Sequence, residues 1–197
     1  MLNLENILFL VAAYLLGAVP FGLVITRLAG LGDIRAIGSG NIGATNVLRT
    51  GRKNLALATL LLDAGKGAIA VLSVGALTTP TVAAAAGAAA FLGHCYPVYL
   101  RFKGGKGVAT FFGTLAAISP VLALAAGGLW LLTALLLRIS SLAALIASAG
   151  APVIAYAIGH TDLLPFVAVM TAVIYLRHRA NIIRLLAGEE PRIGKKD

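Results

Sequence analysis

Long runs of apolar residues separated by short polar turns constrain the fold of this chain more than any other feature. Of the 197 residues, 59% are apolar or aromatic, only 12% are charged, and the mean hydropathy is +0.95. Soluble proteins have about a quarter of their residues charged. Because apolar helices of about 20 residues cross a bilayer, the composition predicts an all-α polytopic membrane protein. It excludes a secreted, fibrous or disordered chain.

Six apolar stretches follow one another, and the fourth is long enough to be divided. We divide it at Ile118–Pro120, because a proline interrupts a helix and a stretch of about 30 residues is long for one span. This gives about seven transmembrane helices in one integral-membrane domain, residues 1–197. The first stretch lacks a preceding positive charge and a suitable cleavage site, so we expect a retained helix. The six stretches cover about residues 7–28, 54–77, 81–100, 108–137, 140–158 and 163–176.

The distribution of positive charge predicts the orientation. If the N-terminus is outside, every Lys and Arg except Lys66 falls on the inner side, and the outer turns near Thr79, Ser119 and Thr161 carry none. Cytoplasmic loops are enriched in these residues, so seven helices with the C-terminus in the cytoplasm fit better than six. The cations assigned to the inner side are Arg27, Arg35, Arg49, Arg52, Lys53, Arg101, Lys103, Lys106, Arg138, Arg177, Arg179, Arg184, Arg192, Lys195 and Lys196.

Composition also limits the packing and the chemistry. Residues 81–93 and 140–159 are dominated by Ala, Gly and Ser, which let helices approach closely in a bilayer, so these spans are predicted to be inner helices. The formal net charge of +9 indicates cytoplasmic loops or anionic partners before nucleic acid. The single cysteine, Cys95, excludes a disulfide framework and a zinc site built on cysteine pairs.

The first polar segment lies in the first inner loop and ends at Arg49. Glycines allow backbone N–H groups to turn toward a ligand, and a following helix N-terminus favours an anion. The segment is therefore suited to a phosphate, although an ordinary polar loop would have a similar composition. Its candidate residues are Ser39, Gly40, Asn41, Gly43, Thr45, Asn46 and Arg49.

The second polar segment, residues 93–110, ends the third span and opens the fourth, and its core at residues 103–107 concentrates two lysines and three glycines. It is not a nucleotide P-loop, because Leu100 and Gly107 occupy the positions where that motif needs a glycine and a Ser or Thr. The lysines alone could serve only to enforce topology, which leaves the glycines unexplained. The candidate phosphate-binding residues are Lys103, Gly104, Gly105, Lys106 and Gly107.

The third polar segment follows the last span. Arg177, Asn181 and Arg184 recur at helical spacing and would share a helix face, with His178 three residues before Asn181. A single interfacial histidine is more often structural, but the two other segments favour a functional role here. Lower-ranked residues are Asp63 and Lys66, interpreted as a structural pair or a wall of the site, Cys95 as a packing residue, and His94 and His160 as structural.

At these three segments the chain resembles the bacterial membrane glycerol-3-phosphate acyltransferases that use acyl phosphate, the PlsY family. The strings SGNIGATNVLR, GHCYPVYLRFKGGKGVAT and RHRANIIRLLAGEEPRIG are similar to the three cytoplasmic motifs of that family, in its order. The resemblance implies seven helices, an outer N-terminus and acyl transfer to the sn-1 hydroxyl of glycerol 3-phosphate. The expected products are lysophosphatidic acid and inorganic phosphate, in the first acylation step of phospholipid synthesis.

The resemblance also implies roles for individual residues. Ser39, Arg49, His178 and Asn181 correspond to the essential residues, residues 103–107 to the glycerol-phosphate site, and Glu189 or Glu190 to an acidic residue with a structural role. We expect cations and backbone N–H groups to hold the phosphates. The proton acceptor is either His178, with an ordinary pKa of about 6.5, or a substrate phosphate. An activated donor requires alignment and charge neutralisation rather than a covalent intermediate.

Other functions fit the sequence less well. No His is followed by Asp five residues later, which excludes the common His-x4-Asp acyltransferases, and scattered aspartates argue against a metal-dependent phosphatidyltransferase. A transporter of organic phosphates is the alternative, but it predicts polar residues along a path through the bilayer. We therefore expect an enzyme of the bacterial cytoplasmic membrane with a cytoplasmic site. We expect no cofactor, metal or nucleic acid, membrane lipids as partners, and a monomer.

Overall fold

The structure of the protein is a computed structural model that describes residues 3–194. All of its regular elements within that range are helices, as the apolar pattern predicts. The fold separates into two compact units, one up to Ile118 and one from Ser119 onward. Each is described by itself, and the expectation of a single domain stays a prediction.

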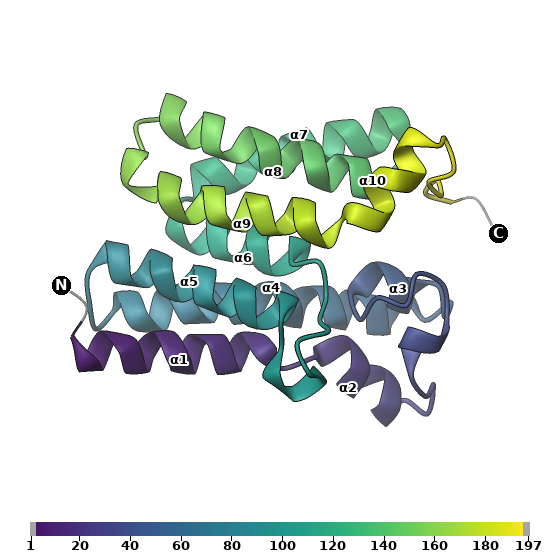
Figure 1. Ribbon diagram of the computed structural model, residues 1–197, viewed down its shortest axis with the longest axis horizontal. Coiled ribbons are helices and arrows are strands. Elements are labelled where there is room, and N and C mark those ends of the chain that lie inside the picture. The colour runs from purple at the N-terminus through teal and green to yellow at the C-terminus, as the bar shows by residue number, and fades with distance from the viewer. Residues whose placement is uncertain (1–2, 195–197) are drawn as a thin grey trace. The chain divides into compact units, whose positions relative to one another are not determined.

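The first unit is a helical bundle in which α1, α4 and α6 all pack against α5 (Figure 1). The short helices α2 and α3 lie together at the end of this unit where α4 begins. Its elements are α1 (Leu4–Ala18), α2 (Phe21–Leu28), η1 (Ile34–Ala36), α3 (Ala44–Leu48), α4 (Lys53–Gly75), α5 (Pro80–Cys95), η2 (Val98–Leu100) and α6 (Val108–Ile118).

Helix α5 is the inner helix of the first unit, as its small residues predict. Within an 18-residue window of the span that contains it, 61% of the residues are buried, against 28% for the corresponding window of the span formed by α1 and α2. A Cβ atom added to Gly17 of α1 would lie 1.9 Å from the carbonyl oxygen of Ala90 on α5, and one on Gly93 would lie 2.1 Å from that of Tyr14. The two backbones touch because these positions lack side chains.

The second unit contains α7 (Pro120–Leu137), α8 (Ser140–Ala157), η3 (Thr161–Leu163), α9 (Leu164–Arg177) and α10 (Arg179–Leu186). The predicted division of the long apolar stretch is confirmed, because α6 ends at Ile118 and Pro120 opens α7, whose first turn is capped by the Ser119 side chain. Helix α8 packs against both α7 and α9, in line with its predicted inner position.

One predicted span is broken, and the chain bends just beyond another. The first run divides into α1 and α2 at Val19–Pro20, since Pro20 has no N–H to continue the helix. The last predicted run, residues 163–176, corresponds to α9, and the chain bends by 61° at His178, where α10 follows. The expectation that Arg177, Asn181 and Arg184 share a face of one continuous helix is therefore wrong, because Arg177 lies before the bend.

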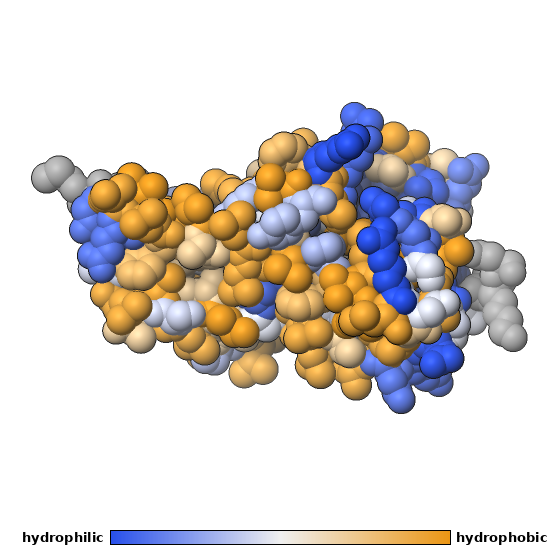
Figure 2. All heavy atoms as spheres, turned by 90° about the horizontal axis from the view of Figure 1, so that it is seen from below, coloured by the Kyte–Doolittle hydropathy of each residue, from blue (hydrophilic) through white to orange (hydrophobic). Residues whose placement is uncertain are grey.

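The helices are apolar and long enough to cross a membrane. Within the described residues, five spans pass that test, the bent α9–α10 pair brings them to six, and the 11-residue α6 is a seventh apolar segment. Exposed side chains such as Leu61, Leu124 and Leu136 are more than half accessible, as expected of a lipid-facing surface. Figure 2 shows hydrophobic residues across the middle of one face and hydrophilic ones toward its ends.

Candidate functional site

Asn46 organises the first motif. Its buried side chain donates from Nδ2 to the carbonyl oxygens of Ile34 (2.8 Å) and Ile37 (3.2 Å), and its Oδ1 accepts from the backbone N–H of Ser39 (3.2 Å) and, more weakly, from the Ser39 hydroxyl (3.4 Å). Because both amide protons and the carbonyl are occupied by the protein, Asn46 positions the loop that carries Ser39. Direct binding of a substrate by Asn46 stays a prediction.

Gly38 permits the compact form of this loop. Its φ is +54°, and an added Cβ would lie 2.6 Å from Cδ of Arg49 and 2.6 Å from Oδ1 of Asn46. The Arg49 side chain therefore lies directly over the glycine backbone, next to the turn that presents Ser39. Because Ser39 follows Gly38 in the chain, the structure brings Ser39 and Arg49, the two predicted catalytic residues of the first motif, close together. Both are exposed.

The remaining predicted residues of this motif play different local roles. Asn41 caps the backbone N–H of Ile42 (2.9 Å), Gly40 turns with a φ of +67°, and Gly43 is the residue that precedes α3. Thr45 is exposed on α3. Arg49 ends this short helix.

A small ion cluster precedes the motif. Asp33 accepts hydrogen bonds from the guanidinium and the backbone N–H of Arg35 and from the guanidinium of Arg27 (3.3 Å). The hydrogen bonds from Arg35 hold the pKa of Asp33 well below its usual range, and Asp33 in turn raises the pKa of Arg35. The cluster is solvent-exposed, so its contribution to stability is small.

Steric contact explains the glycines of the second motif. An added Cβ at Gly104 would lie 2.2 Å from the carbonyl oxygen of His94, one at Gly105 would lie 2.1 Å from Nε2 of His94, and one at Gly107 would lie 2.2 Å from the Phe91 ring. The loop thus lies directly on the last turns of α5. Close packing accounts for all three glycines, so they are not by themselves evidence of an anion site. The charge of this loop comes from Lys103, which is exposed, and from Lys106, which is half-buried.

His178 occupies the bend between α9 and α10 and is 2% exposed. Its Nδ1 lies 2.8 Å from the carbonyl oxygen of Ile174. Because a carbonyl oxygen only accepts, Nδ1 carries a proton, and the lone pair of the neutral ring is on Nε2. This arrangement fixes both the tautomer and the orientation of the ring.

Glu190 is one of the two acidic residues that the resemblance offers for a structural role. Its Oε1 accepts from Asn181 Nδ2 (2.5 Å) and from the Ser141 hydroxyl (2.6 Å), and its Oε2 accepts from Arg184 Nε (2.8 Å). The structure therefore favours Glu190 over the exposed Glu189 as the structural acid of this motif. The helical spacing of Asn181 and Arg184 was the signal that a shared partner lies beside them.

The ionisation of Glu190 is set by these partners. Burial disfavours its charged form, but the hydrogen bonds from Ser141, Asn181 and Arg184 and the charge of Arg184 outweigh burial, so the pKa of Glu190 is lowered. The carboxylate consequently stays charged at neutral pH and fixes the amide of Asn181.

Asp63 and Lys66 form the pair that their spacing predicts. Lys66 Nζ lies 2.9 Å from Asp63 Oδ1 in the interior of the first unit, and Cys95 is buried nearby, as expected of a packing residue. Among residues 3–194, no three His, Cys, Asp or Glu side chains gather in a way that would hold a metal ion.

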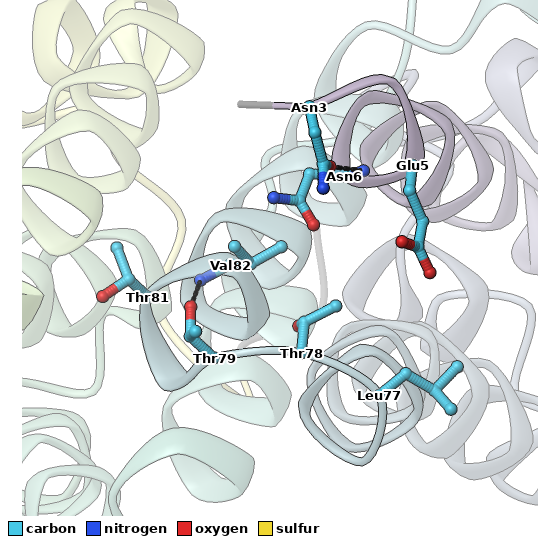
Figure 3. Close-up of a pocket in the computed structure, with 8 residues that line it drawn as sticks. All are labelled: Asn3, Glu5, Asn6, Leu77, Thr78, Thr79, Thr81 and Val82. Carbon is cyan, nitrogen blue, oxygen red and sulfur yellow. Dashed lines mark hydrogen bonds between the residues drawn. The ribbon is translucent and has the colours of Figure 1, made fainter. Parts of the chain in front are cut away.

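An open pocket of about 590 Å³ lies at the other end of the first unit, where α1 begins and α4 connects to α5 (Figure 3). Among the described residues, its lining includes Asn3, Glu5 and Thr78 and no Lys or Arg. It is therefore unsuited to a phosphate, and the length of α4 separates it from the first motif.

Comparison with known proteins identifies the family. Residues 7–188 match the family model described as glycerol-3-phosphate acyltransferase. The chain is 62% identical over 185 residues to a glycerol-3-phosphate acyltransferase of Dinoroseobacter shibae, covering 94% of this chain and 91% of the relative. The chain belongs to the glycerol-3-phosphate acyltransferase family. It is 60% identical to the relative from Paramagnetospirillum magneticum, over 98% of this chain and 96% of the relative.

Solved structures agree with this assignment. The chain is similar to a crystal structure of PlsY described as an integral membrane glycerol 3-phosphate acyltransferase in its glycerol 3-phosphate form, with a TM-score of 0.92, 41% identity and 96% of each chain covered. The lysophosphatidic acid form of PlsY gives a TM-score of 0.90 at the same identity and coverage. The predicted resemblance and the multi-pass acyltransferase fold are thereby confirmed.

Proposed function

We propose that this acyltransferase moves a fatty acyl group from acyl phosphate to the sn-1 hydroxyl of glycerol 3-phosphate. The products are lysophosphatidic acid and inorganic phosphate, and the reaction occurs at the cytoplasmic face of the bacterial cytoplasmic membrane. The observation that carries the proposal is the likeness, over 96% of both chains, to PlsY in forms named for glycerol 3-phosphate and lysophosphatidic acid.

The site residues are assigned to the steps of this reaction as part of the proposal. Arg49 and Lys106 neutralise phosphate charge, together with backbone N–H groups. Ser39, placed beside Arg49 by Asn46, orients a substrate group at the reacting carbonyl. An acyl phosphate is already activated, so alignment and stabilisation of charge on the tetrahedral intermediate are the main demands on the protein.

The third motif is assigned to the same reaction. Asn181, whose amide is held by Glu190, orients a reacting oxygen. The proton of the attacking hydroxyl goes either to Nε2 of His178 or to a phosphate of the substrate. The hydrogen bond between His178 Nδ1 and Ile174 supports the first route, because it leaves the lone pair on Nε2 in the neutral ring.

Release of inorganic phosphate by the purified protein tests the proposal. We expect release from palmitoyl phosphate that requires glycerol 3-phosphate and yields lysophosphatidic acid. Arg49→Ala is expected to lower this turnover by at least about a hundredfold, the effect of removing one group that stabilises developing charge. Arg52→Ala, which removes an exposed arginine three residues away, is the matched control and should keep activity within about twofold.

Two outcomes contradict the proposal. Phosphate release that is independent of glycerol 3-phosphate makes the chain a hydrolase rather than an acyltransferase with this acceptor. An equal loss in Arg49→Ala and Arg52→Ala shows that positive charge near the membrane surface, and not Arg49 itself, supports turnover.

A further inference from the structure

The interior of the first unit holds a charged pair that the proposed mechanism does not use. Asp63 and Lys66 are 3% and 1% exposed, and Asp63 lies about 15 Å along α4 from its first residue, at 1.5 Å per residue. Charged side chains inside a membrane-spanning helix are costly and generally serve function. A buried ion pair is also weak evidence of stabilisation, because apolar residues often replace one without loss.

Both members of the pair reach beyond their own helix. Lys66 Nζ donates to the carbonyl oxygen of Val19 (3.1 Å), at the break between α1 and α2, and lies 5.7 Å from the centre of the Phe21 ring. On the other side, Asp63 Oδ1 lies 3.5 Å from Nδ1 of His94, in the last turn of α5. The pair therefore connects α4 with α2 and with the end of α5.

His94 lies directly against the loop that contains Lys103 and Lys106. Its carbonyl oxygen accepts the backbone N–H of Gly105 (3.0 Å), and its ring fills the space where a Gly105 Cβ would lie. The orientation of the His94 ring therefore determines how closely the loop backbone at Gly105 approaches α5. Asp63 faces this ring, so its charge bears on the loop through one intermediate side chain.

The end of the loop is tied to the same residue. The Thr110 hydroxyl, in the first turn of α6, donates to the backbone carbonyl oxygen of Asp63 (2.8 Å). The N–H of Phe111 then bonds to the carbonyl oxygen of Gly107 (2.7 Å). Residues 103–107 are consequently anchored to Asp63 in two places: at Gly105, through His94, and just after the loop, through Thr110.

We propose that Asp63, Lys66 and His94 are positioning residues that hold the loop of residues 103–107 in the geometry that binds the phosphate of glycerol 3-phosphate. The inference rests on the proposed function, in which Lys106 of this loop neutralises phosphate charge, and it takes that phosphate to be the one of glycerol 3-phosphate, as the family resemblance implies. Asp63 and Lys66 act through His94 and the backbone and do not themselves touch the substrate. Small displacements of a binding group are enough to cost catalysis and binding heavily.

Steady-state kinetics with both substrates varied tests this role. Asp63→Asn keeps the shape of the side chain and removes its charge, and we expect it to raise KM for glycerol 3-phosphate about tenfold while KM for palmitoyl phosphate stays within about twofold. KM does not depend on the amount of folded enzyme, so partial misfolding does not imitate the effect. Thr59→Val is the matched control, because Thr59 is buried one turn earlier in α4 and its hydroxyl donates to the carbonyl oxygen of Leu55 in its own helix (2.8 Å).

The double variant Asp63→Asn with Lys66→Met separates positioning from stability. Removing both charges eliminates the unpaired buried charge that a single substitution leaves, so the folded yield should recover. If the pair positions the loop, KM for glycerol 3-phosphate stays raised in the double variant. A return of that KM to the wild-type value overturns the proposal, as does an equal rise of both KM values.

A second readout does not depend on activity. Trypsin cleavage after Lys103 or Lys106 in detergent reports how firmly the loop is held, and we expect it to be at least about threefold faster in Asp63→Asn than in the wild type and Thr59→Val. Equal cleavage rates contradict the positioning role. If the wild type shows no turnover that depends on glycerol 3-phosphate, the proposed function fails, whereas the cleavage comparison still decides whether the pair holds the loop.

Discussion

At the scale of single residues, the Glu190 carboxylate accepts hydrogen bonds from Ser141, Asn181 and Arg184. These partners lower its pKa in the folded protein. A lowered pKa means that the stabilisation is complete above the ordinary pKa of a glutamate, about 4.3, and is lost as the pH falls through the lowered value. Protonation of Glu190 in acid should therefore weaken its hydrogen bonds with Ser141, Asn181 and Arg184 and destabilise the third motif.

Glu190→Gln tests this link between charge and stability. One carboxylate oxygen becomes an NH2 group, so a donor faces a donor at either Arg184 or Asn181. We expect a loss of about 1 kcal/mol at pH 7, or about 2–4 °C in Tm, discounted for the surface position. The Tm difference from the wild type should shrink toward pH 3. Glu189→Gln, at the exposed neighbouring position, is the control, and a Tm difference that does not vary with pH contradicts the assignment.

The sequence was sufficient to predict which residues belong to the motifs, but not what several of their side chains contact. Ser39 and Arg49 could be recognised from composition and resemblance, and the structure brings them together. Asn46 positions the Ser39 loop through hydrogen bonds to the carbonyl groups of Ile34 and Ile37. The sequence does not show where these groups lie in space. Gly105 looked like a ligand-binding glycine, but its proximity to His94 already requires the absence of a side chain.

At the scale of elements, backbone contact between helices explains the small residues. A Cβ on Gly113 of α6 would lie 2.0 Å from the carbonyl oxygen of Ala64 on α4, and Gly67 of α4 faces Thr110 and Thr114 of α6 in the same way. Close approach of this kind replaces the hydrophobic effect as the source of association between helices in lipid. The α4–α6 contact should accordingly be sensitive to single methyl groups.

Gly113→Ala is expected to force α4 and α6 apart. The obstructing atoms belong to the Ala64 backbone and cannot move aside as a side chain would, so we expect a loss of about 1–3 kcal/mol, measured as a lower Tm in detergent. Gly65→Ala is the matched control on α4, because nothing lies within 4 Å of its added Cβ. That variant should keep or raise Tm through its better helix propensity. Equal Tm values for the two variants contradict close packing at Gly113.

Element boundaries were predictable where local chemistry sets them. Ser119 and Pro120 mark the α6–α7 boundary through a cap and a fixed φ. The same reasoning applied to Pro20 would have found the α1–α2 break. No proline or glycine lies next to the bend at His178 in the sequence. The bend depends instead on contacts of the folded chain, so the sequence did not predict it.

At the scale of the whole molecule, the number of spans and their orientation are separate questions. The apolar segments found in residues 3–194 agree with about seven helices, while the orientation follows from the charge distribution alone. Every Lys and Arg outside α4's interior falls on one predicted side. That asymmetry predicts an outer N-terminus and a cytoplasmic position for all three motifs.

Cysteine labelling decides the orientation, and the chain is suited to it because Cys95 is its single cysteine and is buried. In a Cys95→Ala background, Thr81→Cys lies at an exposed position near the predicted outer turn, and Arg52→Cys lies at an exposed position near the first motif. We expect a membrane-impermeant maleimide to label Thr81→Cys in intact spheroplasts and Arg52→Cys only after lysis. The reverse pattern inverts the topology, moves the proposed phosphate-binding loops outside and contradicts a cytoplasmic site. Both variants are labelled under the same conditions, so the one that stays unlabelled until lysis shows that the spheroplasts are intact.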